Sequence, residues 1–220
     1  MAPINFYMMH VSSPCRGVWM VLKELGLEFN LKYTDLMKNE HMTPEFLKMN
    51  PQHCIPTVDD NGFIMWESRA IMLYLAEKYS KNSNFYPKDN PEKIYQINRF
   101  LFFDMDKMYG KTGQYIYPKM LEGKELDPEK EKAMKQSYDL LDGYLEGKKY
   151  VTGDHMTVAD LSIAASVMFS TLIDYDISGW KNVSRWLNTM KKLPYFEECN
   201  SGLDSFKQYM KSRKGVVAHH

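Results

Sequence analysis

The sequence has few cysteines and no excess of charge of either sign. Its 220 residues include three cysteines, Cys15, Cys54 and Cys199, an odd number without the paired spacing of a disulfide framework or a zinc site. Lysine plus arginine and aspartate plus glutamate both total 28, so no net charge attracts polyanions and we expect no nucleic-acid partner. The cysteine pattern favours a reducing compartment, and we expect a cytoplasmic protein without a metal site.

Long hydrophobic runs are also missing. No apolar segment reaches the roughly 20 residues that a membrane-spanning helix needs. Residues 1–7 lack the basic and apolar regions of a secretion signal. We therefore expect neither membrane association nor export. The hydrophobic fraction of 44% in 220 residues is nevertheless enough for a well-packed core in one large domain or two smaller ones.

The first third of the chain alternates strand and helix signals. An apolar run, an amphipathic segment that ends before Gly26 and a second apolar run predict a βαβ unit with parallel strands. Two further short runs flank Asn61 and Gly62, a strong hairpin signal, and a helical pattern starts at Ser68. The predicted strands are residues 4–9, 29–36, 55–58 and 63–66, and the predicted helices are 14–25 and 68–79.

The rest of the chain has helical signals and no strand alternation. A polar, turn-rich stretch near residues 80–91 predicts a boundary between a domain at 1–82 and an all-helical domain at 91–214. The predicted fold is therefore α/β plus all-α, a thioredoxin-like βαβ-ββα domain followed by helices. We expect residues 215–220 to be either disordered or an added tail outside the natural fold.

Four helices are predicted in the second domain from local signals. Pro91 and Pro128 each suit the first turn of a helix. Thr157 and Asp160 are spaced as a capping box ahead of an apolar run, which predicts a buried helix. Residues 182–193 predict a further helix, which Pro194 interrupts.

Residues 12–16, Ser-Ser-Pro-Cys-Arg, lie where the first strand ends and the first helix begins. Free amides and the positive end of the helix dipole favour an anion there. Ser12 could donate to a thiolate that a ligand brings and lower its pKa from about 8.5 toward roughly 3.5–7.5. Ser12 could also simply cap the helix. Cys15 has no cysteine partner at position 12, which excludes a Cys-x-x-Cys disulfide.

Two further segments could bind a ligand. Pro56, directly ahead of a predicted strand, could follow a cis bond and expose the backbone of Ile55 to an extended peptide, or it could be an ordinary trans proline. Glu67 could bind an ammonium group and Ser68 a carboxylate, or both could serve a helix cap. Arg69 is expected to form an ion pair rather than to contact a ligand.

The histidines near these segments are less specific. His53 precedes the proline segment and could contact the remainder of a bound peptide. His41 lies in a polar stretch, where it could be a solvated surface residue or could contact a carboxylate.

Taken together, these motifs resemble the cytosolic glutathione transferases, specifically the insect delta and epsilon classes and most closely delta. The similarity runs to about Tyr209. Its specific parts are residues 12–16, 39–41, 44–53, Pro56, 67–69 and 153–160. The resemblance implies an enzyme in which the thiolate of glutathione attacks a hydrophobic electrophile, without metal, in detoxification of xenobiotics. It also implies a homodimer and allows for peroxidase or dehydrochlorinase side activity.

The resemblance also implies roles for individual residues. Ser12 would donate to the sulfur, and the backbone of Ile55 would pair with the cysteinyl residue of glutathione. The γ-glutamyl end would contact Glu67 and Ser68, with Arg69 beside them, and the glycyl end His41 and His53. Cys54 and Pro56 adjoin this site. Val11 and Cys54 depart from the glycine and threonine that the family often has.

The electrophile site is less well defined by sequence. The resemblance points to the first helix of the second domain and to the C-terminal segment. We single out Tyr109, Tyr117 and Phe206, although aromatic residues at helical spacing are commonly core. Tyr7, the sulfur donor position of other classes, lies inside an apolar strand and is expected to pack.

Two other functions compete with the transferase. A protein of the same fold could bind apolar ligands without catalysis, although an intact Ser12, Glu67 and Ser68 argue against this. A thiol oxidoreductase could use Cys15 or Cys54, which the lack of a cysteine at position 12 disfavours.

Overall fold

A computed structural model describes residues 3–214, and its N-terminal part contains one four-stranded mixed sheet. The strands lie in the order β2-β1-β3-β4. β1 and β2 are parallel, as the predicted βαβ unit requires, while β3 is antiparallel to both β1 and β4. The strands are β1 (Ile4–Met8), β2 (Phe29–Tyr33), β3 (Thr57–Asp60) and β4 (Phe63–Met65).

The hairpin between β3 and β4 forms at the dipeptide that predicts it. Asp60 pairs with Phe63, which leaves Asn61 and Gly62 as the two loop residues. Their φ angles are 55° and 92°. Both lie in the left-handed region that a two-residue type I′ hairpin requires, and asparagine and glycine adopt this region most readily.

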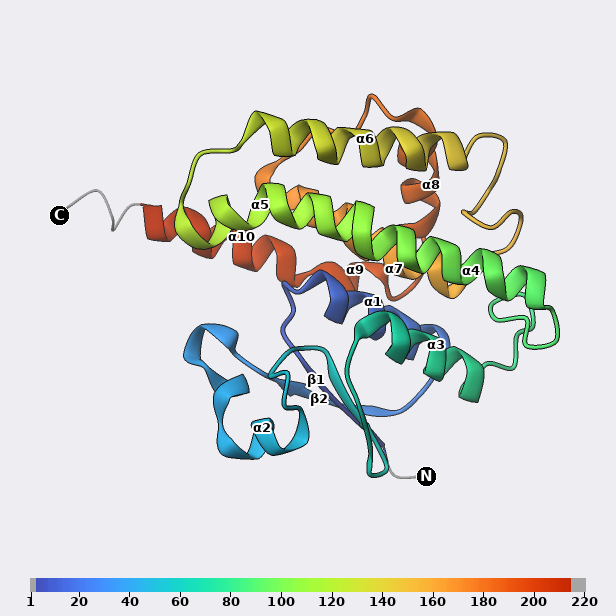
Figure 1. Ribbon diagram of the computed structural model, residues 1–220, viewed down its shortest axis with the longest axis horizontal. Helices are drawn as coiled ribbons and strands as arrows, with labels where there is room; N and C mark the ends of the chain where they lie inside the picture. The colour runs from blue at the N-terminus through green and yellow to red at the C-terminus, as the bar shows by residue number, and fades with distance from the viewer. Residues whose placement is uncertain (1–2, 215–220) are drawn as a thin grey trace.

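Helices cover both faces of the sheet. In Figure 1, α1 (Ser13–Glu24) and α3 (Ser68–Tyr79) lie between the strands and the helical domain. On the opposite face, α2 (Pro44–Met49) packs against β1, where the rings of Phe46 and Tyr7 meet edge to face at 5.9 Å. Tyr7 is thus a packing residue, as expected from the alternation of β1.

The second part of the described chain is helical. The α4 helix continues through a π-helical segment into α5, and α7 is buried along most of its length. The predicted capping box of Thr157 and Asp160 forms at the start of α7. The elements are α4 (Pro91–Phe103), the π segment Asp104–Tyr109, α5 (Gly110–Glu122), α6 (Pro128–Tyr144), α7 (Val158–Phe169), α8 (Lys181–Met190), α9 (Phe196–Asn200) and α10 (Gly202–Lys214).

The N-terminal and helical parts meet through α1. It packs along α7 and touches α9, so the start of α1 lies at the junction of the two parts. Gly17 of α1 comes close to the backbone of Ser162, where an added Cβ would lie 3.7 Å from the Cα of that residue. The segment that carries Ser12 is therefore held between the sheet and the helical part.

Several predicted boundaries are wrong, and short helices were missed. β2 ends at Tyr33 because Asp35 accepts a hydrogen bond from the amide of Met37 at 2.9 Å and starts a 3₁₀ helix, Leu36–Lys38. β3 begins at Thr57, after the predicted start. The helix predicted at residues 182–193 is Lys181–Met190. The helices α2, α9 and α10 were not predicted, and residues 215–220 lie outside the described residues.

Candidate functional site

Ser12 lies at the end of a tight turn and at the start of α1. Its amide donates to the carbonyl of Met9 at 3.0 Å, and its Oγ accepts from the amide of Cys15 at 3.4 Å. Ser12 therefore caps α1, which is one of the two roles predicted for it from the sequence. The capping bond uses a lone pair of the oxygen and leaves the hydroxyl proton able to donate. At the positive end of the helix, this half-buried hydroxyl can face an anion.

Cys15, by contrast, is fully buried beneath the start of the helix. Its side chain has 0% exposure, and burial raises the pKa of its thiol to about 12. Burial also raises the pKa of Cys199 to about 12. Both thiols are protonated at neutral pH, so neither has the thiolate character that an oxidoreductase needs.

Asn50 organises the loop that contains His53, Cys54 and Ile55. Its buried amide donates to the carbonyl oxygen of Cys54 at 3.1 Å and to the Oγ1 of Thr57 at 2.8 Å. The hydroxyl of Thr57 in turn donates to the same carbonyl at 2.8 Å. Neither Asn50 nor Thr57 was predicted to belong to the site. The one local signal is the dipeptide Asn50-Pro51, which indicates a turn but not the buried hydrogen bonds around it.

The Ile55–Pro56 peptide bond is cis. Within residues 3–214, the backbone N–H and C=O of Ile55 have no hydrogen-bond partner. Ile55 is half-buried, and it lies two residues before the start of β3. This backbone can pair with an extended peptide in the manner of a sheet edge.

The start of α3 forms a second candidate anion site. Glu67 has φ 68° and ψ 96°, and its carboxylate does not cap the helix. The capping interpretation of Glu67 is therefore wrong. Its side chain is exposed, and the next residue, Ser68, is 5% exposed at the first turn of α3. A carboxylate and a helix N-terminus lie together here, which suits a ligand with both an ammonium and a carboxylate.

Arg69 makes an ion pair that joins the two parts of the protein. Its Nη2 lies 2.6 Å from Oδ2 of Asp104, which is fully buried and also accepts a hydrogen bond from Ser162 of α7. Its Nη1 donates to the Oγ of Ser68 at 3.0 Å. Arg69 thus fixes the orientation of the Ser68 hydroxyl through this hydrogen bond. The partner Asp104 could not be found from the sequence because it lies 35 positions away.

The two histidines lie near each other. The ring centroids of His41 and His53 are 6.0 Å apart, although the residues are on different segments. His53 is exposed with φ 42°, and Nδ1 of His41 is buried without a hydrogen-bond partner among the described residues. The pair can offer N–H donors to a carboxylate.

The two tyrosines proposed for the electrophile pocket face each other in the helical part. The hydroxyls of Tyr109 and Tyr117 are 2.9 Å apart, and the guanidinium of Arg69 lies 5.0 Å from the ring centroid of Tyr109. Burial raises the pKa of both phenols. Arg69 thus lies between Ser68 at the start of α3 and the ring of Tyr109.

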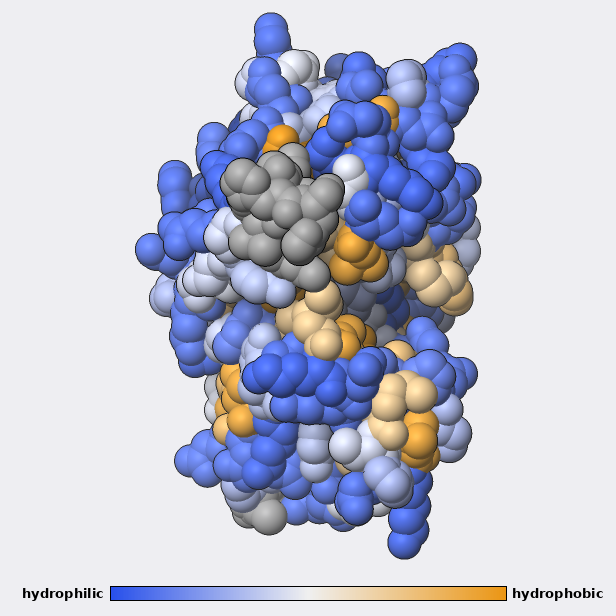
Figure 2. Space-filling view, turned by 90° about the vertical axis from the view of Figure 1, so that its left-hand side faces the viewer, coloured by the Kyte–Doolittle hydropathy of each residue, from blue (hydrophilic) through white to orange (hydrophobic). Residues whose placement is uncertain are grey.

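Two neighbouring cavities open beside the start of α10. One has a volume of about 720 Å³ and a mostly apolar wall that includes Met120, Leu172 and Met210. The other, of about 730 Å³, lies against the turn before Ser12. Phe206 lines both cavities, whereas Tyr109 and Tyr117 line neither. Figure 2 shows this face, where apolar residues gather around a hollow between the two parts.

His10 is a residue that the sequence analysis missed. It lines the second cavity two positions before Ser12, and its ring lies 5.5 Å from that of Trp19 and 5.3 Å from that of Tyr33. Burial lowers the pKa of His10. α10 begins against it, because a Cβ at Gly202 would collide with the Cβ of His10. Only a glycine permits this approach.

The described residues contain no group of three or more His, Cys, Asp or Glu side chains arranged to hold a metal ion. None of their helices combines the length and the apolar character needed to cross a membrane.

Comparison with known proteins agrees with the fold and with the motifs. Residues 6–83 match the family model of the glutathione S-transferase N-terminal domain, and residues 97–194 match that of the C-terminal domain. A delta-class glutathione transferase of Nilaparvata lugens is 44% identical, with a TM-score of 0.91 over 96% of this chain and 99% of that one. An epsilon-class enzyme of the housefly Musca domestica is 33% identical, with a TM-score of 0.88 over 95% and 97%.

A third similar structure contains glutathione. It is a glutathione transferase homologue of Drosophila mojavensis, 29% identical, with a TM-score of 0.89 over 96% of this chain and 98% of that one. The protein therefore consists of a thioredoxin-like domain joined to a helical domain. The chain belongs to the glutathione transferase family, with delta- and epsilon-class structures among its relatives. It is an enzyme that uses glutathione as cosubstrate.

Proposed function

We propose that this transferase conjugates the glutathione thiolate to hydrophobic electrophiles in the detoxification of xenobiotics, with Ser12 as the donor to the sulfur. The observation that carries the proposal is the hydroxyl of Ser12 at the start of α1, whose proton is not used by its capping bond. A donor and a positive helix end together favour the thiolate over the thiol. The thiolate attacks an electrophilic carbon, and the leaving group or π-electron pair takes up the charge.

The remaining contacts follow the direction of the bound tripeptide. The unpartnered backbone of Ile55, which Cys54 and the cis bond to Pro56 flank, pairs with the cysteinyl residue. Glu67 and Ser68 hold the γ-glutamyl ammonium and carboxylate, and Arg69 positions Ser68. His41 and His53 approach the glycyl carboxylate. Residues 1–82 thus form the glutathione domain.

The electrophile occupies the apolar cavity of the second domain, residues 91–214. Phe206 supports this placement because it lines both cavities, and a mostly apolar wall selects a hydrophobic molecule. Tyr109 and Tyr117 line neither cavity, and they stay proposed contacts of the electrophile because Tyr109 lies beside Arg69 of the glutathione site. Peroxidase or dehydrochlorinase side activity, with a cytoplasmic location, belongs to the same proposal.

The proposal is tested by the ultraviolet difference spectrum of glutathione bound to the wild type, titrated from acid to alkaline pH. We expect a thiolate band well below the pKa of the free thiol, together with turnover of an electrophile such as benzyl chloride. Measurable glutathione binding without the band or turnover would instead support a non-catalytic binding protein of the same fold.

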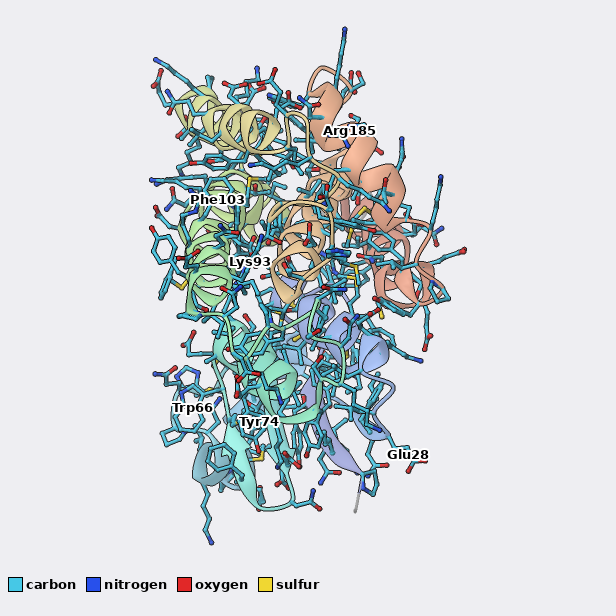
Figure 3. All side chains as sticks on the ribbon, turned by 90° about the vertical axis from the view of Figure 1, so that its right-hand side faces the viewer. Glu28, Trp66, Tyr74, Lys93, Phe103 and Arg185 are labelled. Carbon is cyan, nitrogen blue, oxygen red and sulfur yellow. The ribbon has the colours of Figure 1, made fainter. Side chains whose placement is uncertain are left out.

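We further propose that the protein is a homodimer. Phe102 and Tyr95 of α4 are each 67% exposed, and Phe63 of β4 is 55% exposed. In Figure 3, Trp66 beside β4 and Phe103 of α4 lie along the same edge of the molecule. Exposed apolar residues on both parts of the chain support a two-fold interface between the first domain of one subunit and the second domain of its partner.

Phe102→Glu is expected to dissociate this dimer, because two charges would be buried at the interface. Sedimentation velocity should give twice the chain mass of 25.9 kDa for the wild type and the single mass for the variant. Leu140→Glu, at a 44% exposed site on α6, is the matched control and should remain dimeric. A wild type with the single mass would contradict the proposal.

A further inference from the structure

Arg16 of α1 carries a buried charge without a carboxylate partner. Its side chain has 0% exposure. Its Nη1 donates to the amide oxygen of Asn200 in α9, and its Nη2 donates to the backbone oxygen of Ala165 in α7 at 3.0 Å. Within the described part of the chain, its Nε has no partner. Buried charges in proteins are normally paired, so this one requires an explanation.

The titratable groups that face Arg16 are all neutral at pH 7. They are Cys15 on α1, Tyr117 on α5 and Cys199 on α9. Burial raises the pKa of both thiols to about 12 and also raises that of the phenol. Burial lowers the pKa of Arg16 to about 9, which still leaves the guanidinium charged at pH 7. An uncompensated positive charge therefore lies inside the protein.

This charge lies on the same helix as Ser12 and close to it in the chain. The amide of Arg16 donates to the carbonyl of Ser12 at 3.0 Å, the first hydrogen bond of α1. Ser12 is the N-cap of α1, so the backbone of Arg16 lies within one helical turn of it. The field of Arg16 thus adds to the helix dipole at the place where the thiolate forms.

We propose that Arg16 is the counter-charge of the glutathione thiolate and stabilises it through space without touching the sulfur. The inference rests on the proposed thiolate chemistry at Ser12. A unit charge at roughly 10 Å, in a medium with an effective dielectric constant of about 20, shifts a pKa by about one unit. This role explains why Arg16 has no carboxylate partner, because a carboxylate beside Arg16 would cancel its field at the thiolate.

A purely structural role would depend on the hydrogen bonds of Arg16 and not on its charge. Its two partners belong to the helical domain, so Arg16 also ties α1 to α7 and α9. The decisive experiment must therefore cancel the charge while the hydrogen bonds stay in place.

Asn200→Asp meets this requirement. Aspartate has the size of asparagine, keeps an oxygen facing Nη1 of Arg16 and supplies the missing carboxylate. In the difference spectrum of bound glutathione, we expect the pKa of the thiol to rise by about one unit. Aspartate loses the bond that Nδ2 of Asn200 donates to the carbonyl of Phe196 at 2.8 Å, and the new ion pair with Arg16 should offset this loss, so the urea midpoint of unfolding should change little. Ser201→Asp adds the same charge at the exposed neighbouring residue and should shift the thiol much less.

Arg16→Met and Arg16→Lys provide the second test. Methionine removes the charge and should raise the thiol pKa by a similar amount, whereas lysine keeps the charge and should restore most of the wild-type value. The inference is overturned if Asn200→Asp and a folded Arg16→Met leave the thiol pKa unchanged, or if Ser201→Asp shifts it equally. If Arg16→Met does not fold, Asn200→Asp alone decides. A wild type without a thiolate band would overturn the proposed function instead.

Discussion

Ser12→Ala is expected to lower kcat for conjugation about 10²-fold and to raise the pKa of the bound glutathione thiol. The hydroxyl of Ser12 is the donor placed at the start of α1, and removal of one such donor from a developing anion costs about 10²–10³ in rate. The pH profile of kcat should shift to alkaline pH with the thiol, because less thiolate is present at neutral pH. Steady-state kinetics and the thiolate difference spectrum measure both effects.

Ser13→Ala is the matched control for this prediction. Ser13 is the adjacent serine, but its side chain is 1% exposed and its Oγ has no hydrogen-bond partner among the described residues. Its removal should change kcat by less than a few-fold. Loss of the cap bond of Ser12 costs about 1 kcal/mol at most, which urea unfolding can measure separately. Equal losses of kcat in the two variants would show that Ser12 is not the donor to the sulfur.

Asp160→Ala is expected to destabilise the protein by about 3 kcal/mol, the largest stability effect that we expect of a single substitution here. The carboxylate is fully buried and connects three segments of the second domain. It accepts from the amide of Val151 at 2.9 Å, the amide and hydroxyl of Thr157 at 2.9 and 3.2 Å, and the indole of Trp186 at 3.0 Å. Alanine would leave these buried donors without an acceptor.

Urea unfolding at one fixed protein concentration tests this prediction, since a dimer makes stability depend on concentration. Asp154→Ala is the matched control, because Asp154 is exposed on the same loop and should change stability by less than about 0.5 kcal/mol. Thr157→Ala removes only part of the capping box and should cost about 1 kcal/mol. A loss below 1 kcal/mol for Asp160→Ala would show that other groups take over its contacts.

The elements predicted correctly are those whose signals are local. The hairpin follows from Asn61 and Gly62, which adopt positive φ without help from the rest of the chain. The capping box of Thr157 and Asp160 satisfies amides within one helical turn. The parallel pairing of β1 and β2 follows from the length of the intervening helix. Each of these structures depends on residues close in sequence.

The missed elements are short or polar and depend on distant contacts. α2 has six residues and α9 five, too few for a hydrophobic period to be recognised. α10 is placed by the contact of Gly202 with His10, which no local pattern indicates. β3 starts later than predicted because Asn50 and Thr57 hold the preceding loop in an irregular shape.

The candidate site likewise contains residues that local sequence indicates and residues that only tertiary contacts reveal. Ser12, Pro56, Glu67 and Ser68 were predicted as site residues because each lies at a strand end or helix start, where chain direction alone exposes backbone groups. Their roles stay proposals until they are tested. Asn50, Asp104 and His10 were not found, since their contacts with the site come from other segments.

By itself, the sequence determined the order of the secondary structure, the family resemblance and the helix start at which an anion is favoured. These depend on periodicity, on turn chemistry and on motifs of a few residues. Only the tertiary structure decided that Arg69 pairs with Asp104 and that Arg16 meets Asn200, 184 positions away, without a carboxylate. The physical reason is that burial and the charges of distant neighbours, which set the electrostatics of the site, arise only when separate segments pack together.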